Sequence, residues 1–196
     1  MTTGFDVPSY LAELSGTIRE LPLSSIDELV QVFLRAYAGG RTIFLFGNGG
    51  SASLASHMSC DLGKGTAPAN GRRLRAVALT DNLALMTAWA NDIRYEAIFA
   101  EQLENLLQPA DVAFAISGSG NSPNILAALN FARKAGAITA GITGFEGGKM
   151  KALCDVCVVV PSDNMQIIED LHLCAAHAVF TAVRRKVCHT SSAASA

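Results

Sequence analysis

The sequence lacks a large net charge and any long apolar run. Its 196 residues hold 15 Lys and Arg against 17 Asp and Glu, for a formal net charge of −2. Without an excess of basic residues, the chain has no electrostatic footprint for nucleic acid. No apolar segment reaches membrane-spanning length, and residues 1–20 lack the charged start and apolar centre of a signal peptide. We therefore expect a soluble, cytoplasmic protein with no nucleic-acid or membrane partner.

Cysteines are too few for a disulfide framework. The chain has five, an odd number for its length, which indicates reduced thiols in apolar positions. Cys154 and Cys157 have the spacing of a redox or zinc-binding pair, but they lie where a strand is expected and no second pair accompanies them. We interpret both as core residues.

Alternating apolar and helical segments predict the fold. Residues 7–19 and 26–38 have the periodicity of amphipathic helices, and a last helix is expected over 164–187. Five short apolar runs separated by helical stretches predict a doubly wound, flavodoxin-like α/β fold with a five-stranded parallel sheet. The predicted strands are residues 42–46, 75–79, 112–116, 138–142 and 156–160.

No internal linker divides the chain. Half of the residues are hydrophobic, which is enough for one well-buried core. We expect a single domain over residues 1–189, with N-terminal helices in 1–40 and the α/β core in 41–189. Residues 190–196 are small and polar, and we expect them to be a disordered tail.

Two turns rich in Gly and Ser follow predicted strands. The first turn is residues 47–51 (Gly-Asn-Gly-Gly-Ser), and the second turn is residues 117–122 (Ser-Gly-Ser-Gly-Asn-Ser). Glycines allow close backbone approach, serines donate, and the next helix offers free N–H groups, so both turns suit an anion such as phosphate. Neither has the Lys of a Walker loop or the spacing of a dinucleotide fingerprint, which favours a phosphorylated small molecule. The alternative is a pair of ordinary tight turns.

These motifs resemble the sugar isomerase (SIS) family. The resemblance rests on both turns, on Ser56-His57 and on residues 143–149 (Thr-Gly-Phe-Glu-Gly-Gly-Lys), and it extends to His177. Within that family the sequence is most similar to the phosphoheptose isomerases, which convert sedoheptulose 7-phosphate to D-glycero-D-manno-heptose 7-phosphate. The resemblance implies a homotetramer with active sites at subunit interfaces, and a zinc ion in each subunit.

The resemblance also implies roles for particular residues. Asn91 and Asp92 match a pair that holds sugar hydroxyls, whereas the two turns match the contacts to phosphate and substrate. Asp61 and Glu169 depart from the best-known members, which carry Glu and Gln at these positions. The implied substrate contacts are Asn48, Gly49, Gly50, Ser51, Asp61, Asn91, Asp92, Ser117, Gly118, Ser119, Ser122 and Glu169. The implied metal ligands are His57, Asp61, Glu169 and His177.

Helical spacing supports this ligand set only in part. His57 and Asp61 are four residues apart and share a helix face, where they could hold a cation or the substrate. Glu169 and His177 are eight apart, so their Cα atoms would lie about 12 Å from each other. One ion reaches both only if the side chains lean together or come from different subunits. Spacing alone favours Glu169 with His172.

The implied chemistry is proton transfer through an enediol. A base removes a proton beside the carbonyl, and an acid and base return it at the neighbouring carbon. Asp61 is the candidate base and His177 the candidate partner for the second proton. Zinc would orient the substrate oxygens. A zinc-bound carboxylate is a poorer base, so the two roles of Asp61 compete.

Three other functions compete with this one. An isomerase of another phosphosugar would have the same two turns. A non-catalytic SIS protein that binds a replication initiator would tend to lose the acid and base residues, and the presence of His57, Asp61 and His177 argues against it. A phosphosugar-sensing domain of a transcriptional regulator is disfavoured because no DNA-binding region precedes residue 40.

Overall fold

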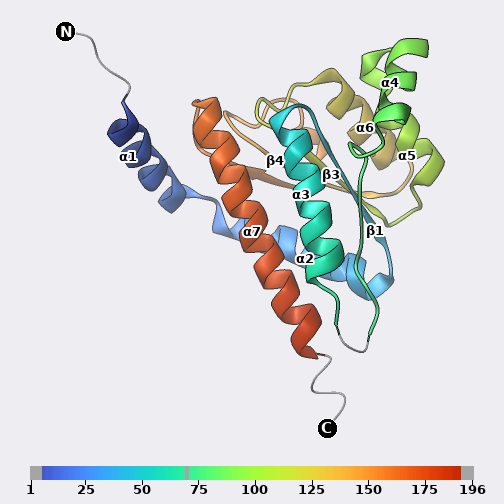
Figure 1. Cartoon of the computed structure of the whole chain (residues 1–196), viewed down its shortest axis with the longest axis horizontal. Helices are drawn as coiled ribbons and strands as arrows, with labels where there is room; N and C mark the ends of the chain where they lie inside the picture. The colour runs from blue at the N-terminus through green and yellow to red at the C-terminus, as the bar shows by residue number, and fades with distance from the viewer. Residues whose placement is uncertain (1–5, 69–70, 191–196) are drawn as a thin grey trace.

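The computed structural model describes residues 6–68 and 71–190. Its centre is a parallel sheet of five strands in the order β2-β1-β3-β4-β5, with helices on both faces (Figure 1). This is the flavodoxin-like strand order, so the predicted doubly wound α/β fold is confirmed. The strands are β1 (Thr42–Gly47), β2 (Arg75–Ala78), β3 (Val112–Ser117), β4 (Ile138–Thr143) and β5 (Val156–Val159).

All five predicted strands are present, each with its predicted start and with its end shifted by one residue. The predicted last helix is also present. The helices are α1 (Val7–Thr17), α2 (Leu23–Gly39), α3 (Gly50–Gly65), α4 (Leu83–Asp92), α5 (Ala100–Leu106), α6 (Pro123–Lys134) and α7 (Met165–Thr190), with short 3-10 turns η1 (Ile18–Glu20), η2 (Tyr95–Ala97) and η3 (Lys151–Leu153). The helix α7 includes Thr190, and the rest of the predicted tail lies outside the described residues.

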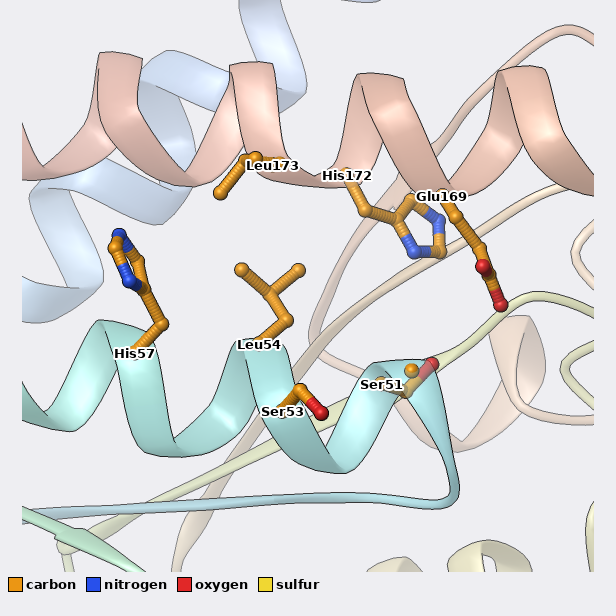
Figure 2. A pocket seen from close by; sticks show the side chains of 8 residues that line it. Ser51, Ser53, Leu54, His57, Glu169, His172 and Leu173 are labelled. Carbon is orange, nitrogen blue, oxygen red and sulfur yellow. The ribbon is translucent and has the colours of Figure 1, made fainter.

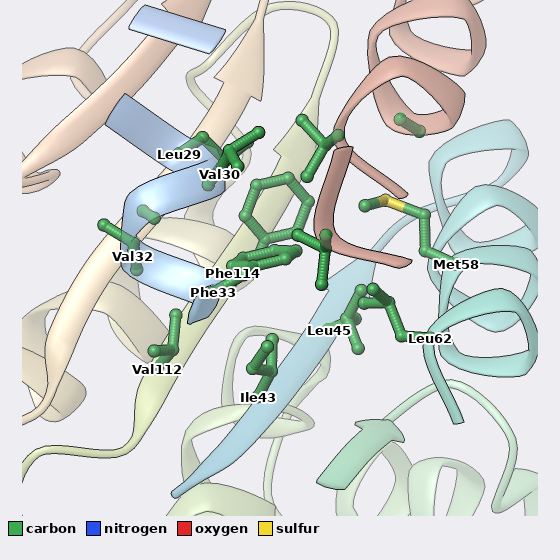
Figure 3. Close-up of a cluster of buried hydrophobic side chains, with 14 of the residues drawn as sticks. Leu29, Val30, Val32, Phe33, Ile43, Leu45, Met58, Leu62, Val112 and Phe114 are labelled. Carbon is green, nitrogen blue, oxygen red and sulfur yellow. The ribbon is translucent and has the colours of Figure 1, made fainter. Parts of the chain in front are cut away.

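Successive side chains of the strands pack alternately into two hydrophobic cores, one on each face of the sheet. Ile43 and Leu45 of β1 pack with α2, α3 and α7, whereas Phe44 and Phe46 pack with α5 and α6 on the opposite face. Figure 3 shows the first core, in which Phe33 of α2 meets Phe114 edge-on with ring centroids 5.5 Å apart. Because both faces are covered, β1 and β3 are buried along their whole length.

The topology brings the two turns together. β1 and β3 are neighbours in the centre of the sheet, and the strand order reverses between them. Ligands of doubly wound folds bind outside the carboxyl ends of the strands at such a switch point. The first turn follows β1 and the second turn follows β3, so both border the expected binding crevice.

The helix α1 packs loosely on the rest of the chain. No residue of α1 is buried, and Val7 and Leu11 are 71% and 56% exposed. Its described ties include a hydrogen bond of 2.6 Å from the Tyr10 hydroxyl to Asp170 of α7. Figure 1 shows α1 projecting from the body of the molecule.

Two remaining sequence predictions concern cysteines and membrane segments. The five cysteines are free, and Cys154 and Cys157 are half-buried beside the second core. Among residues 6–68 and 71–190, no helix has the length and apolar character needed to span a bilayer.

Candidate active site

The first turn places the start of α3 at the switch point. Gly49 has a φ of +55°, in the left-handed region that favours glycine, and the N–H of Ser51 donates to the Asn48 carbonyl at 3.0 Å. No side chain caps this end of α3. The N–H groups of Ala52 and Ser53 donate to the carbonyls of Asn48 and Gly49, and the positive end of the helix dipole lies at the first turn.

The second turn presents hydroxyl groups. The Ser117 and Ser119 hydroxyls accept hydrogen bonds from the N–H groups of Gly120 and Asn121, each at 3.2 Å. Each hydroxyl keeps its own O–H as a donor. Ser122 precedes α6 and makes no capping bond with its side chain, so its hydroxyl is also available. Ser117 is 5% exposed, which makes Ser119 and Ser122 the more accessible donors.

His57, Asp61 and His177 form a compact cluster, hereafter the His–Asp–His cluster. His57 and Asp61 are one turn apart on α3, and His177 reaches them from α7. The two Nε2 atoms are 2.9 Å apart. Asp61 Oδ2 lies 3.4 Å from His57 Nε2 and 3.7 Å from His177 Nε2. The side chains of both histidines are about half exposed, so the cluster is open to solvent.

The cluster has the dimensions of a zinc site. Zinc–nitrogen bonds of about 2.0–2.1 Å in a tetrahedron place neighbouring ligand atoms about 3.3 Å apart. The three separations in the cluster scatter around this value, and one ligand atom from each residue lies within 4.8 Å of the others. Two imidazoles and a carboxylate are also a usual donor set for zinc. The residues therefore fit a divalent metal ion.

Glu169 lies outside this cluster. Its carboxylate reaches toward the start of α3, where a Cβ added to Gly50 would stand 3.2 Å from either carboxylate oxygen. Figure 2 shows Glu169 beside Ser51, while His57 lies two helical turns further along α3. The positive end of the α3 dipole favours a carboxylate here. The structure thus brings together three of the four implied metal ligands and places the fourth at the first turn.

A cavity of about 300 Å³ connects these groups between α3 and α7. Glu169 and His57 both line it (Figure 2). Ser51 and Ser53 contribute hydroxyls, and Leu54 and Leu173 contribute apolar walls. A ligand in this cavity would touch the first turn at one end and His57 of the His–Asp–His cluster at the other.

His172 also lines the cavity, and it is 1% exposed. Its Nε2 has no hydrogen-bond partner among the described residues. Burial lowers the pKa of His172 to about 4, against a smaller opposing effect of its hydrogen bond to the backbone of Thr143. The ring is therefore neutral at pH 7, with its Nε2 buried beside the cavity.

This pKa makes the stability of the fold depend on pH. Because the folded-state pKa is below the unfolded value of about 6.5, the unfolded chain binds the proton first, and stability falls as pH drops from about 6.5 toward 4. Between pH 7 and pH 5 the wild-type chain should lose about 2 kcal/mol more unfolding free energy than His172→Gln. Urea denaturation at both pH values measures this difference, and equal losses would show that His172 is not held neutral.

Asn91 and Asp92 end α4 on the surface. Both are exposed, and the Asn91 amide donates to the Asp92 carboxylate at 2.8 Å. The described contacts do not join either residue to the His–Asp–His cluster. Their predicted role in holding sugar hydroxyls stays a prediction.

Sequence reasoning missed three polar residues of this region. His172 was noted only for its spacing from Glu169. Asn124 and Tyr95, which hydrogen-bond Asn48, carry no local motif. Asn48 is 47 positions from Tyr95 and 76 positions from Asn124 in the sequence. Contacts over such separations leave no signal in the spacing of residues within one helix or strand.

Comparison with known proteins identifies the family of the chain. The SIS domain is matched over residues 9–144. The phosphoheptose isomerase of Paramagnetospirillum magneticum is 41% identical over 86% of this chain and 85% of its own length. The solved phosphoheptose isomerase from Francisella tularensis superposes with a TM-score of 0.86 at 26% identity, covering 94% of this chain and all of that one. The structure from Neisseria gonorrhoeae gives 0.84 at 28% identity, with coverage of 90% and 96%. The chain therefore belongs to the SIS domain family, among relatives that are phosphoheptose isomerases.

Proposed function

We propose that this chain is an aldose–ketose isomerase that converts sedoheptulose 7-phosphate to D-glycero-D-manno-heptose 7-phosphate. The observation that carries the proposal is the His–Asp–His cluster, in which His57 and Asp61 lie on α3, the helix that begins at the first turn, and His177 lies on α7. Six residues separate Ser51 from His57, about 9 Å along α3. The names of the most similar relatives support the same reaction.

The phosphate group would bind between the two turns. Ser119 and Ser122 keep free O–H donors, and the positive ends of the α3 and α6 dipoles lie at the two turns. The remaining contacts would orient the sugar. The full proposed set is Asn48, Gly49, Gly50, Ser51, Asp61, Asn91, Asp92, Ser117, Gly118, Ser119, Ser122 and Glu169.

Asp61 and His177 would move the protons. Asp61 removes a proton from C1 of the ketose while the C2 carbonyl oxygen gains one, which gives the enediol. The O1 hydroxyl then loses its proton and C2 receives one, which completes the aldose. His177, with Nε2 3.7 Å from Asp61 Oδ2, carries the second proton. A side chain that is half exposed can exchange that proton with water.

A zinc ion would complete the site. His57, Asp61 and His177 have the donor atoms and separations to hold it. When bound, zinc supplies Lewis-acid stabilisation of negative charge on the substrate oxygens. Within the single chain Glu169 stands outside this cluster, so its role as a ligand rests on the family resemblance. Metal binding and base catalysis compete for the same Asp61 carboxylate.

We propose further that four copies assemble, with sites at their interfaces. The exposed apolar side chains of Val7 and Leu11 in α1 and of Ile18 in η1, and the open His–Asp–His cluster, fit contact with another subunit. Light scattering at micromolar concentration should give about four times 20.5 kDa. A stable, active monomer would refute this assembly.

A phosphorylated sugar as substrate fits the predicted cytoplasmic location, since such charged metabolites are retained inside the cell.

Substrate comparison tests the proposed function. Purified protein should give its highest kcat/KM with sedoheptulose 7-phosphate, a lower value with fructose 6-phosphate, and little activity with unphosphorylated sedoheptulose. A chelator should reduce turnover, and added zinc should restore it. Faster conversion of fructose 6-phosphate would indicate an isomerase of another phosphosugar. Binding without conversion of either phosphate would indicate a non-catalytic SIS protein.

A further inference from the structure

The side chains of Asn48 and Asn124 form a two-way amide pair. Asn48 Nδ2 donates to Asn124 Oδ1 at 2.9 Å, and Asn124 Nδ2 donates to Asn48 Oδ1 at 2.8 Å. The Tyr95 hydroxyl donates to the same Asn48 oxygen at 3.0 Å. We call these three residues the Asn–Asn–Tyr network.

One backbone contact fixes the orientation of both amides. The N–H of Ile125 donates to Asn124 Oδ1 at 3.0 Å, so this atom must be the acceptor. Asn48 must then turn its NH₂ group toward Asn124 Oδ1 and its oxygen toward Asn124 Nδ2. That oxygen is an acceptor only, so the Tyr95 O–H must be the donor.

The network leaves the Asn48 side chain little capacity for a ligand. Its oxygen already accepts two hydrogen bonds, the number of its lone pairs, and one of its two N–H donors is occupied. Asn124 is 1% exposed, so it is shielded from any ligand in the crevice. A buried amide is costly unless it is fully hydrogen-bonded, and here both of its ends are used to hold another segment.

The network joins three segments that border the crevice. Asn48 belongs to the first turn, and Asn124 lies two residues beyond Ser122, the last residue of the second turn. Tyr95 begins η2, three residues after Asp92. These segments come from different parts of the chain, and backbone pairing between strands ends before it reaches them.

We propose that Asn124 and Tyr95 are positioning residues, which hold the first turn at a fixed distance from the second turn so that both contact one phosphorylated sugar. The proposal rests on the proposed function and deepens it. It assigns the Asn48 side chain to this framework and leaves the recognition of the ligand at this position to the backbone N–H groups of the turn. Loss of the network should weaken ligand binding and change the chemical step much less.

Two substitutions test this with sedoheptulose 7-phosphate as the probe. Tyr95→Phe removes one hydroxyl and should raise KM about 2–10-fold, the effect of one neutral hydrogen bond. Asn124→Ala removes the amide pair and should raise KM about 10–100-fold. In both variants kcat should stay within about threefold of the parent value. The double variant should be little worse than Asn124→Ala alone, because groups that act as a unit are non-additive.

Matched controls lie close by. Asn130→Ala alters an exposed amide of the same helix, α6, which bonds only the Leu126 carbonyl in the described contacts, and Tyr37→Phe alters a half-buried tyrosine of α2. Both should leave KM unchanged. If Asn124→Ala does not fold, Tyr95→Phe, at a position 52% exposed, still gives the decisive comparison.

Calorimetric binding separates this inference from the proposed function. The dissociation constant of sedoheptulose 7-phosphate should rise in the variants by the same factors as KM. A parent protein that binds the sugar phosphate without converting it would contradict the isomerase function and leave the positioning role standing if the factors hold. Unchanged affinity in both Tyr95→Phe and Asn124→Ala, or fully additive losses in the double variant, would overturn the positioning role.

Discussion

Replacing Asp61 with Asn is expected to lower kcat at least about 10²-fold in a folded chain, the usual lower bound for loss of a positioned acid or base. Asn has nearly the same shape as Asp and can still contact the substrate, but it cannot accept a proton. The effect should fall on kcat, since the two Ser/Gly turns that would bind phosphate are untouched. Steady-state kinetics with sedoheptulose 7-phosphate measure it.

His177→Gln should show a loss similar to that of Asp61→Asn. The double variant should lose less than the product of the separate losses, because the two residues act as a unit. Their side chains are in contact distance, with Nε2 of His177 3.7 Å from Asp61 Oδ2. Fully independent losses would argue against a shared proton path.

Two controls separate proton transfer from metal binding and from general effects. Asp27→Asn makes the same chemical change at an exposed position of α2 and should leave kcat unchanged. Bound zinc should be measured in each variant. If metal binding dominates, both site variants should lose zinc and regain activity in excess zinc. Near-normal turnover of Asp61→Asn would show that another group is the base.

The second large effect is expected from Ser119→Ala, which should raise KM for the sugar phosphate about 10–100-fold. A hydrogen bond to a charged group contributes about 1.5–3 kcal/mol, and each 1.4 kcal/mol is a factor of about ten. The Ser119 hydroxyl accepts from the Asn121 N–H and so keeps its proton free for the phosphate. The measurement is KM for sedoheptulose 7-phosphate beside that for the unphosphorylated sugar.

The control for this change is Ser24→Ala, at an exposed position of α2, which should leave KM as it is. The effect should also vanish for the unphosphorylated sugar, which lacks the group that Ser119 would hold. Equal binding of phosphorylated and unphosphorylated sugar by the parent protein would contradict the phosphate role of the turns.

The fold was predictable because its signals are local. Each strand lies in a short apolar run, and β1, β3 and β5 begin directly after the charged residues Arg41, Asp111 and Asp155. All five predicted starts agree with the structure. β1, β3 and β4 end one residue later than predicted because Gly47, Ser117 and Thr143 continue the ladder, whereas β2 and β5 end one residue earlier. The strand order, and the position of the first and second turns side by side at the switch point, follow from the general rule for doubly wound sheets.

The candidate site was only partly predictable. His57 and Asp61 share a helix face, which their spacing indicates directly. His177 lies 120 residues from His57, and only the family resemblance brought it into the set. Spacing paired Glu169 with His172, and the structure places both residues on the cavity rather than in the His–Asp–His cluster. Asn124 and Tyr95 act through long-range hydrogen bonds that no local pattern reveals.

The most direct test of the account is proton NMR of the purified, zinc-supplied protein with sedoheptulose 7-phosphate in heavy water. Proton transfer through Asp61 and His177, both in contact with solvent, predicts an aldose heptose 7-phosphate that carries deuterium at the carbon beside its carbonyl. The variant that combines Asp61→Asn with His177→Gln should leave the ketose unchanged. An unchanged ketose with the folded parent protein would contradict the account.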